Sequence, residues 1–140
     1  MTQESGAPSG IPAIRTLAMP GDTNPNGDIF GGWVMAQMDL AGGITAGWRA
    51  QGRVATVAVE GMTFLKPVKV GDVICVYTDI EHEGNTSMSI KVEVWALRRT
   101  SRVREKVTEA CFTFVAIDEY GKKRALPPVP ENEMMLGQGT

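Results

Sequence analysis

The feature that most constrains this fold is the run from Ile29 to Trp48, whose only charged side chain is Asp39. Its Ala, Met, Leu and Gln residues favour a helix, predicted to begin near Gly31 and to fade between Trp48 and Gly52. Apolar side chains occupy nearly every face of that helix, whereas a surface helix keeps one polar face. The run therefore predicts a core helix wrapped by other structure.

Asp39 is unusual in these surroundings, because a buried charge costs several kcal/mol unless a partner compensates for it. No neighbour on the same helix face can pair with a carboxylate. These neighbours are Met35, Gly42, Gly43 and Ala46. Desolvation makes a carboxylate a stronger base, and the glycines leave room for a substrate or a partner helix. The residues alone leave two interpretations open: Asp39 takes part in catalysis, or it faces a crevice water or caps a neighbouring loop.

Beyond Arg53 the apolar residues recur with a period of two, which indicates strands. In one segment Met88, Ile90, Val92, Val94 and Ala96 share a face, and Ser89, Lys91 and Glu93 share the other. This alternation is typical of a half-buried antiparallel strand. The predicted strands are 11–19, 54–68, 73–83, 87–99 and 107–118, joined by turns short enough for a meander. We predict an α+β fold, with an antiparallel sheet of about five strands curled around a long central helix.

A chain of 140 residues fits one domain. We expect a flexible N-terminal tail over 1–10, a single domain over 11–127 and a flexible C-terminal tail over 128–140, which is rich in proline and then polar.

A net charge of -2 argues against nucleic acid as a partner. Neither a signal peptide nor a membrane span is predicted, so we expect a cytoplasmic protein.

Cysteine and histidine chemistry has little support. Cys75 and Cys111 form no C-x-x-C pair, so neither a disulfide framework nor a metal site is predicted. His82 is the only histidine and is expected to be exposed, because Glu81 and Glu83 flank it. Hydrolysis by a Ser-His-Asp or Cys-His arrangement needs a histidine beside the nucleophile. The predicted helix has no histidine, which excludes these mechanisms there.

A set of short motifs occurs in a fixed order between Thr16 and Pro127. They are N-x-N-G-D-I-F-G-G-W at 24–33, M-D at 38–39, V-E-G-M-T-F at 59–64, V-G-D-V at 70–73 and R-A-L-P at 124–127. Each motif alone is weak, but all five in this order form a specific signature. Through them the chain resembles the YciA-type acyl-CoA thioesterases, which have the hotdog fold.

The resemblance implies hydrolysis of acyl-CoA to a free fatty acid and coenzyme A. It also implies hotdog dimers with active sites at their interface, assembled further into trimers of dimers. In the family the helix aspartate acts as general base or nucleophile and a loop asparagine assists it, and these positions are Asp39 and Asn24 here. The family's oxyanion-binding amides correspond to Gly31 and Gly32. No cofactor or metal is implied, because coenzyme A is part of the substrate and product.

These residue types suit the implied chemistry. A helix start presents unpaired amides and partial positive charge, and glycines such as Gly31 and Gly32 let a ligand approach the backbone. Asn24 has a second interpretation, because an Asn before Pro commonly forms an Asx turn. The sequence does not decide whether Asp39 activates water or attacks the thioester to form an anhydride.

The phosphates of coenzyme A require basic residues near the pocket mouth. Two basic clusters are candidates: Arg98, Arg99, Arg102, Arg104 and Lys106 form the first, and Lys122, Lys123 and Arg124 form the second. Arg124 is the best single candidate, because it lies inside the R-A-L-P motif. Thr86 and Ser87 follow a Gly-Asn turn, so they either donate hydrogen bonds to the substrate or simply begin a strand.

The residues leave a second function possible. A non-catalytic acyl-CoA or fatty-acyl binding module is the alternative function, and it predicts binding without turnover.

Oligomerisation has a physical basis, because one sheet covers only one side of an apolar helix. A dimer that joins two sheets edge to edge and brings the two helices together supplies the missing cover.

Overall fold

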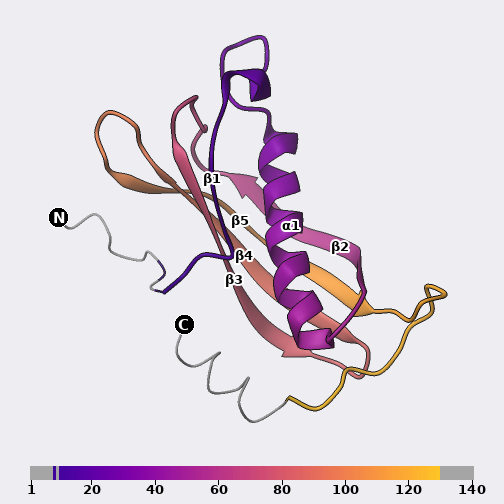
Figure 1. The fold of residues 1–140 in the computed structure, drawn as a ribbon. Coiled ribbons are helices and arrows are strands. Elements are labelled where there is room, and N and C mark those ends of the chain that lie inside the picture. Colours follow the sequence, from indigo (N-terminus) through magenta and orange to yellow (C-terminus); the bar gives the residue numbers. More distant parts are fainter. Residues whose placement is uncertain (1–7, 9, 130–140) are drawn as a thin grey trace.

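The computed structural model describes residue 8 and residues 10–129. The predicted tails, 1–10 and 128–140, lie almost entirely outside the described residues. In the described residues one long helix lies across one face of a five-stranded antiparallel sheet, as Figure 1 shows. This confirms the α+β architecture and the long helix. No helix in this part of the chain is long and apolar enough to cross a membrane.

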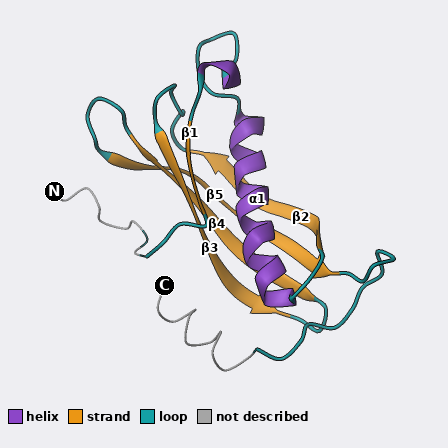
Figure 2. Ribbon diagram, viewed as in Figure 1, coloured by secondary structure: helices purple, strands orange, loops and turns teal. Residues whose placement is uncertain are grey.

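The predicted elements are all present (Figure 2). Strand β4 stops before its predicted end, because the backbone turns at Arg98, whose amide donates to the Val103 carbonyl at 2.9 Å. This tight turn also lets the last strand begin before the predicted Val107. The elements are β1 (Ile14–Leu17), η1 (Pro20–Asp22), α1 (Gly31–Ala50), β2 (Val54–Phe64), β3 (Val73–Glu83), β4 (Ser87–Leu97) and β5 (Arg104–Ala116).

The strand order is β1-β3-β4-β5-β2. The predicted meander is therefore right for β3 to β5 and wrong for β2, which pairs with β5 and not with β3. Residues 65–72 carry the chain back across the sheet past the helix start, where the Ile29 amide donates to the Val68 carbonyl at 3.0 Å. This path leaves the short β1 and the long β2 as the two edge strands.

Helix α1 begins and ends through local backbone geometry. At its start the Phe30 carbonyl accepts the amides of Trp33 and Val34, at 3.1 and 3.3 Å. At its end Gln51 has a left-handed φ of 55°, and the Gly52 amide donates to the Gly47 carbonyl at 3.2 Å. This pattern closes many helices. The predicted start near Gly31 and the predicted end region are confirmed.

The core is the layer between α1 and the sheet. The alternation predicted for 87–99 is confirmed, because its apolar face is buried against the helix layer while Ser89, Lys91 and Glu93 are less buried. Helix α1 contributes one buried face to this layer. The core includes Val34, Met38, Ala41 and Ala46 from α1, with Ile74, Val76, Met88, Ile90, Val92, Val94, Phe112 and Phe114 from the sheet.

Gly42 allows α1 to approach β5 closely. A Cβ at this position would lie 2.8 and 2.9 Å from two ring atoms of Phe114. We therefore expect Gly42→Ala to lower the free energy of unfolding by about 1–3 kcal/mol, although Ala favours helix. Urea denaturation at fixed protein concentration measures this. Gly43→Ala is the matched control, because its nearest Phe114 atom is 3.9 Å away, and equal stability of the two variants would contradict the packing argument.

One face of α1 and the neighbouring edge strand remain uncovered. Leu40 is 57% exposed and Trp48 is 74% exposed, and the set continues onto β2. We call it the uncovered apolar face, and it comprises the exposed apolar residues Phe30, Met35, Leu40, Ile44 and Trp48 of the helix and its start, with Val59 and Phe64 on the helix side of β2. The sheet covers only one side of the helix in the single chain, as expected for an apolar helix packed on one sheet. Apolar surfaces of this kind mark interaction sites.

Candidate active site

Asp39 lies on the exposed side of α1, among residues of the uncovered apolar face. The carboxylate is therefore not desolvated within the single chain, contrary to the expectation of burial. It does have a partner from another element: the Thr56 hydroxyl on β2 donates to Asp39 Oδ1 at 2.6 Å. This hydrogen bond holds Oδ1, while Oδ2 has no hydrogen-bond partner among the described residues.

Thr56 joins the candidate site through this hydrogen bond, and the sequence analysis did not single it out. Its register partner across the sheet is Phe114, a core residue, so both side chains lie on the helix side of the sheet. The signal was present in the strand pattern, since a hydroxyl on the core-facing side of a strand needs a partner. Only the packing of β2 against α1 shows that this partner is Asp39.

Asn24 lies in the loop before α1 and organises it. Its side-chain Oδ1 accepts the amides of Asn26 and Asp28, at 2.9 and 3.1 Å, which is an Asx-turn arrangement. The structural interpretation of this residue is therefore correct. The Asn24 side-chain nitrogen has no hydrogen-bond partner within residues 10–129 and can still donate to a ligand.

Gly31 and Gly32 provide the free amides expected at a helix start. Trp33 and Val34 are the first residues whose amides bond to the Phe30 carbonyl, and no backbone acceptor occurs for the two glycine amides in the described chain. Both glycines are exposed. A Cβ on Gly31 would press on the Phe64 ring at 3.3 Å, whereas Gly32 borders open space. The pair is suited to binding a carbonyl oxygen that gains negative charge.

The helix start and Asp39 do not meet in one chain. Eight residues separate Gly31 from Asp39, which corresponds to about 12 Å along a helix. A thioester carbonyl bound at the helix start is therefore out of reach of the Asp39 carboxylate of the same chain. A complete site requires both groups within contact of one carbonyl carbon.

The predicted substrate contacts Thr86, Ser87 and Arg124 lie at the other end of α1. The Thr86 carbonyl accepts the Ala116 amide of β5 at 2.9 Å, and the Ser87 carbonyl accepts the Gly84 amide across the β3–β4 turn at 2.8 Å, so the backbone of both residues serves to begin β4. Arg124 is half-buried, and its Nε donates to the Ile117 carbonyl at 2.9 Å. Figure 1 shows this C-terminal segment beside the end of α1, away from the helix start.

The two predicted basic clusters differ in how their charges are used. Arg98 in the first cluster pairs with the buried Asp72 at 2.6 Å and with Glu105 at 2.8 Å, and the second contact lowers the pKa of the Glu105 carboxyl. Arg104 lies over the rings of Tyr77 and Trp95. Arg98 therefore joins the start of the β4–β5 turn to the loop before β3, whereas Arg104 packs against rings of β3 and β4. In the second cluster Lys122 and Lys123 are exposed, and Arg124 is held by the Ile117 carbonyl.

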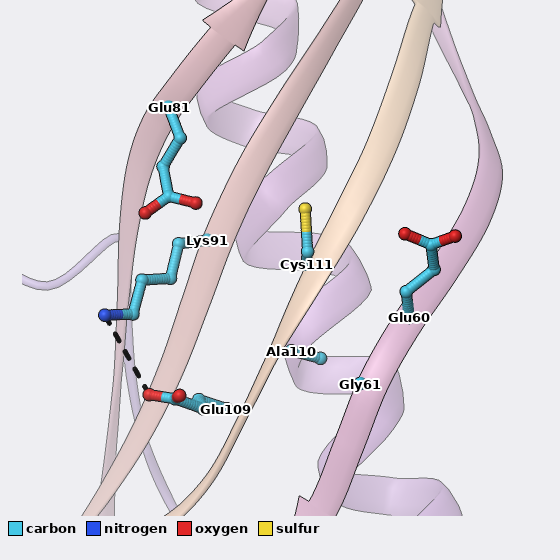
Figure 3. A pocket seen from close by; sticks show the side chains of 7 residues that line it. All are labelled: Glu60, Gly61, Glu81, Lys91, Glu109, Ala110 and Cys111. Carbon is cyan, nitrogen blue, oxygen red and sulfur yellow. Dashed lines mark ion pairs between the residues drawn. The ribbon is translucent and has the colours of Figure 1, made fainter.

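A hollow of about 360 Å³ lies on the opposite face of the sheet, as Figure 3 shows. Three carboxylates line it, and its one cation, Lys91, pairs with Glu109 at 3.9 Å. Burial and the nearby Glu81 and Glu60 raise the pKa of the Cys111 thiol there, which disfavours the reactive thiolate. An acidic hollow does not suit an anionic substrate, and no predicted site residue lines it. His82 is exposed on β3, as predicted.

Comparison with known proteins decides the family. The sequence matches the model of the thioesterase superfamily over residues 26–102. It is 55% identical over 130 residues to the acyl-CoA thioester hydrolase YciA of Escherichia coli K12, a match that covers 91% of this chain and 98% of the relative. The chain belongs to the YciA-type acyl-CoA thioesterases. This thioesterase is therefore an acyl-CoA thioester hydrolase, which disfavours the alternative of a non-catalytic binding module.

Solved structures agree with this assignment. A hexameric broad-specificity acyl-coenzyme A thioesterase aligns with a TM-score of 0.87 at 49% identity, covering 100% of this chain and 97% of that chain. A hexameric hotdog-fold thioesterase of Campylobacter jejuni aligns with a TM-score of 0.81 at 40% identity, covering 94% and 98%. The predicted hotdog fold of this thioesterase is confirmed.

Proposed function

We propose that this thioesterase hydrolyses acyl-CoA in a site completed by two copies of the chain, with Asp39 of one copy acting on a thioester held at the helix start of the other. The observation that carries this proposal is the separation of the two groups within one chain. Asp39 also lies on the uncovered apolar face, where a second copy would bind. Separated halves on an incomplete surface favour an interface site.

Strand β2 supplies the edge for this dimer. It has 11 residues, whereas the other edge strand, β1, has four. A long unpaired edge is a template for another strand. A two-fold axis perpendicular to the sheet pairs β2 with its copy in antiparallel fashion, and the same axis makes the two α1 helices run in opposite directions. The Gly31 amide of one copy then faces the middle of the other helix, where Asp39 lies.

The groups divide the chemistry between them. The amides of Gly31 and Gly32 stabilise the oxyanion that forms on the thioester carbonyl. Asp39 either takes a proton from the attacking water or attacks the carbonyl itself, and Asn24 donates its free amide hydrogens to the water or the substrate. Arg124, Thr86 and Ser87 are proposed contacts to the coenzyme A portion. The sulfur of coenzyme A then leaves as a thiolate.

Free-thiol release from a panel of acyl-CoAs, short to long, tests the proposal. Wild-type protein and Asp39→Ala are compared, and binding of the same substrates is measured in parallel. We expect turnover to be lost in the variant while binding survives. Binding without turnover in the wild type would overturn the proposed function.

We further propose that dimers assemble into a trimer of dimers in the cytoplasm. The solved relatives named above are hexamers. Light scattering of the purified chain is expected to give the mass of six copies. Dilution should release dimers before folded monomers, because the dimer buries the uncovered apolar face.

Thr56 is proposed to position the Asp39 carboxylate. Thr56→Val removes the 2.6 Å hydrogen bond while keeping the side-chain shape. A hydrogen bond to a charged group contributes about 1.5–3 kcal/mol, so we expect kcat to fall about tenfold or more with little change in KM. Steady-state kinetics measures both. Thr56→Ser keeps the hydroxyl and should restore most of kcat, whereas equal losses in both variants would indicate a packing role only.

A further inference from the structure

Two contacts fix how α1 lies along the edge strand β2. At the helix start, a Cβ on Gly31 would lie 3.3 Å from the Phe64 ring, at the last residue of β2. Further along the helix, the Asp39 carboxylate accepts the Thr56 hydroxyl at 2.6 Å, near the beginning of β2. The helix start is therefore level with Phe64, and Asp39 is level with Thr56.

The neighbouring strand β5 serves as a ruler for these two levels, because β2 itself has register shifts on both sides of its middle. Three register pairs mark the positions: Thr56 with Phe114, Glu60 with Cys111, and Phe64 with Thr108. Their β5 partners follow one another at intervals of three residues. Glu60 therefore lies midway between the levels of Thr56 and Phe64 along the sheet.

This midpoint locates the two-fold axis of the proposed dimer. An axis that brings Asp39 of one copy to Gly31 of the other must pass midway between these two groups. On β2 the midpoint is Glu60, and on α1 it is Met35, which is 39% exposed on the uncovered apolar face. A residue on the axis of an antiparallel strand pair lies opposite its own copy.

The side-chain directions on β2 agree with this register. The axis places Thr56 of one copy opposite Phe64 of the other, and directly opposite residues point to the same face of a sheet. Both lie on the helix side, because their β5 partners are at most 1% exposed. A slip of one residue would set Thr56 opposite Thr63, whose register partner Glu109 lines the hollow on the other face.

Glu60 lies at the rim of that acidic hollow, on the edge strand beside Cys111 (Figure 3). Its side chain is exposed and forms no ion pair within the described residues. Lys91 is the only cation that lines the hollow, and it is shared between Glu93 and Glu109 at 3.2 and 3.9 Å. The charge of the Glu60 carboxylate is therefore not neutralised within one chain.

We propose that Glu60 of one copy lies directly opposite Glu60 of its partner at the two-fold axis, and that their repulsion limits how tightly the two copies bind. This inference rests on the proposed function, which requires the dimer. Like charges directly opposite each other on paired strands destabilise the pair. The uncovered apolar face supplies the attraction, so dissolved salt strengthens the dimer by screening the opposing charges.

Disulfide trapping tests the position of the axis. All variants carry Cys111→Ser, because Cys111 is the register partner of Glu60 and would compete for the new thiol. Glu60→Cys is expected to cross-link two copies on mild oxidation, since the Cα atoms of opposite residues lie about 4.5–5.5 Å apart. Non-reducing gels measure the cross-linked fraction, and turnover of the reduced protein shows that the fold is intact.

Ala58→Cys and Thr63→Cys are the matched controls. Their register partners, Thr113 and Glu109, lie two residues to either side of Cys111. Each new thiol is then about 13 Å from its own copy along the strand, too far for a disulfide. A chain that carries both substitutions should cross-link, because the axis sets residue 58 of one copy opposite residue 63 of the other. Cross-linking by either single control, or none by Glu60→Cys, would overturn the position of the axis.

Glu60→Gln tests the repulsion. At low salt this variant is expected to unfold at a higher urea concentration than the wild type at the same protein concentration, with unchanged turnover. The difference should shrink toward 1 M salt, where the Debye length is about 3 Å. Asp79→Asn removes one charge from the same face on β3, away from β2, and should shift the midpoint less.

The outcomes separate this inference from the proposed function. Equal urea midpoints for Glu60→Gln and the wild type at low salt would show that the two carboxylates do not repel each other. An active enzyme that cross-links at another position would overturn the axis and leave the function standing. Wild-type protein that hydrolyses no acyl-CoA would contradict the function itself.

Discussion

Replacing Asp39 with Asn is expected to lower kcat for acyl-CoA hydrolysis by about 10²–10⁴-fold, the usual contribution of a general base. The amide keeps the size of the side chain and can still accept the Thr56 hydroxyl, so packing on β2 should persist. It can neither take a proton from water nor attack a carbonyl. Free-thiol release under saturating acyl-CoA measures the loss, and KM should change little.

Asp79→Asn is the matched control. This aspartate is exposed on β3, and its register partner is Lys91 on the face of the sheet away from the helix. The control should retain wild-type turnover. Normal activity in Asp39→Asn would show that the helix carboxylate is not catalytic. Rapid mixing with a labelled acyl group then distinguishes the two mechanisms, because only nucleophilic attack by Asp39 forms a covalent acyl-enzyme.

Val59→Lys is expected to abolish both assembly and activity. Val59 lies on the edge strand β2 opposite Phe112 in register, so its side chain is on the helix side of the sheet, and it is 38% exposed in the single chain. In the proposed dimer a lysine there would be buried without a partner. Inward-pointing charges are a known barrier to edge-to-edge strand pairing. Activity should fall with assembly, because each site needs two copies.

Light scattering and activity assays on the same samples measure these effects. Val103→Lys provides the control, since Val103 is exposed to a similar extent, 37%, in the turn between β4 and β5. We expect the control to keep the wild-type mass and turnover. A Val59→Lys variant that is monomeric, folded by circular dichroism and fully active would show that one chain contains a complete site.

Much of the fold could be predicted from the local pattern of apolar, polar and glycine residues. The start of α1 at Gly31 follows from glycines after a turn-rich loop, and the bounds of β3, Val73–Glu83, match the predicted strand. The place of β2 in the strand order could not be predicted, because alternation shows which face of a strand is buried and not which strand lies beside it. Pairing of β2 with β5 depends on contacts between residues far apart in the sequence.

The sequence by itself singled out the candidate residues for the chemistry, because a lone carboxylate in an apolar helix and glycines at a helix start are unusual features of local pattern. Only the tertiary structure decided how they relate. It placed Thr56 on Asp39, separated Asp39 from Gly31 along the helix axis, and left one helix face without cover. It also set Glu60 midway between the levels of Thr56 and Phe64 along the sheet. Local periodicity encodes burial, whereas such distances arise only when strands and helix pack together.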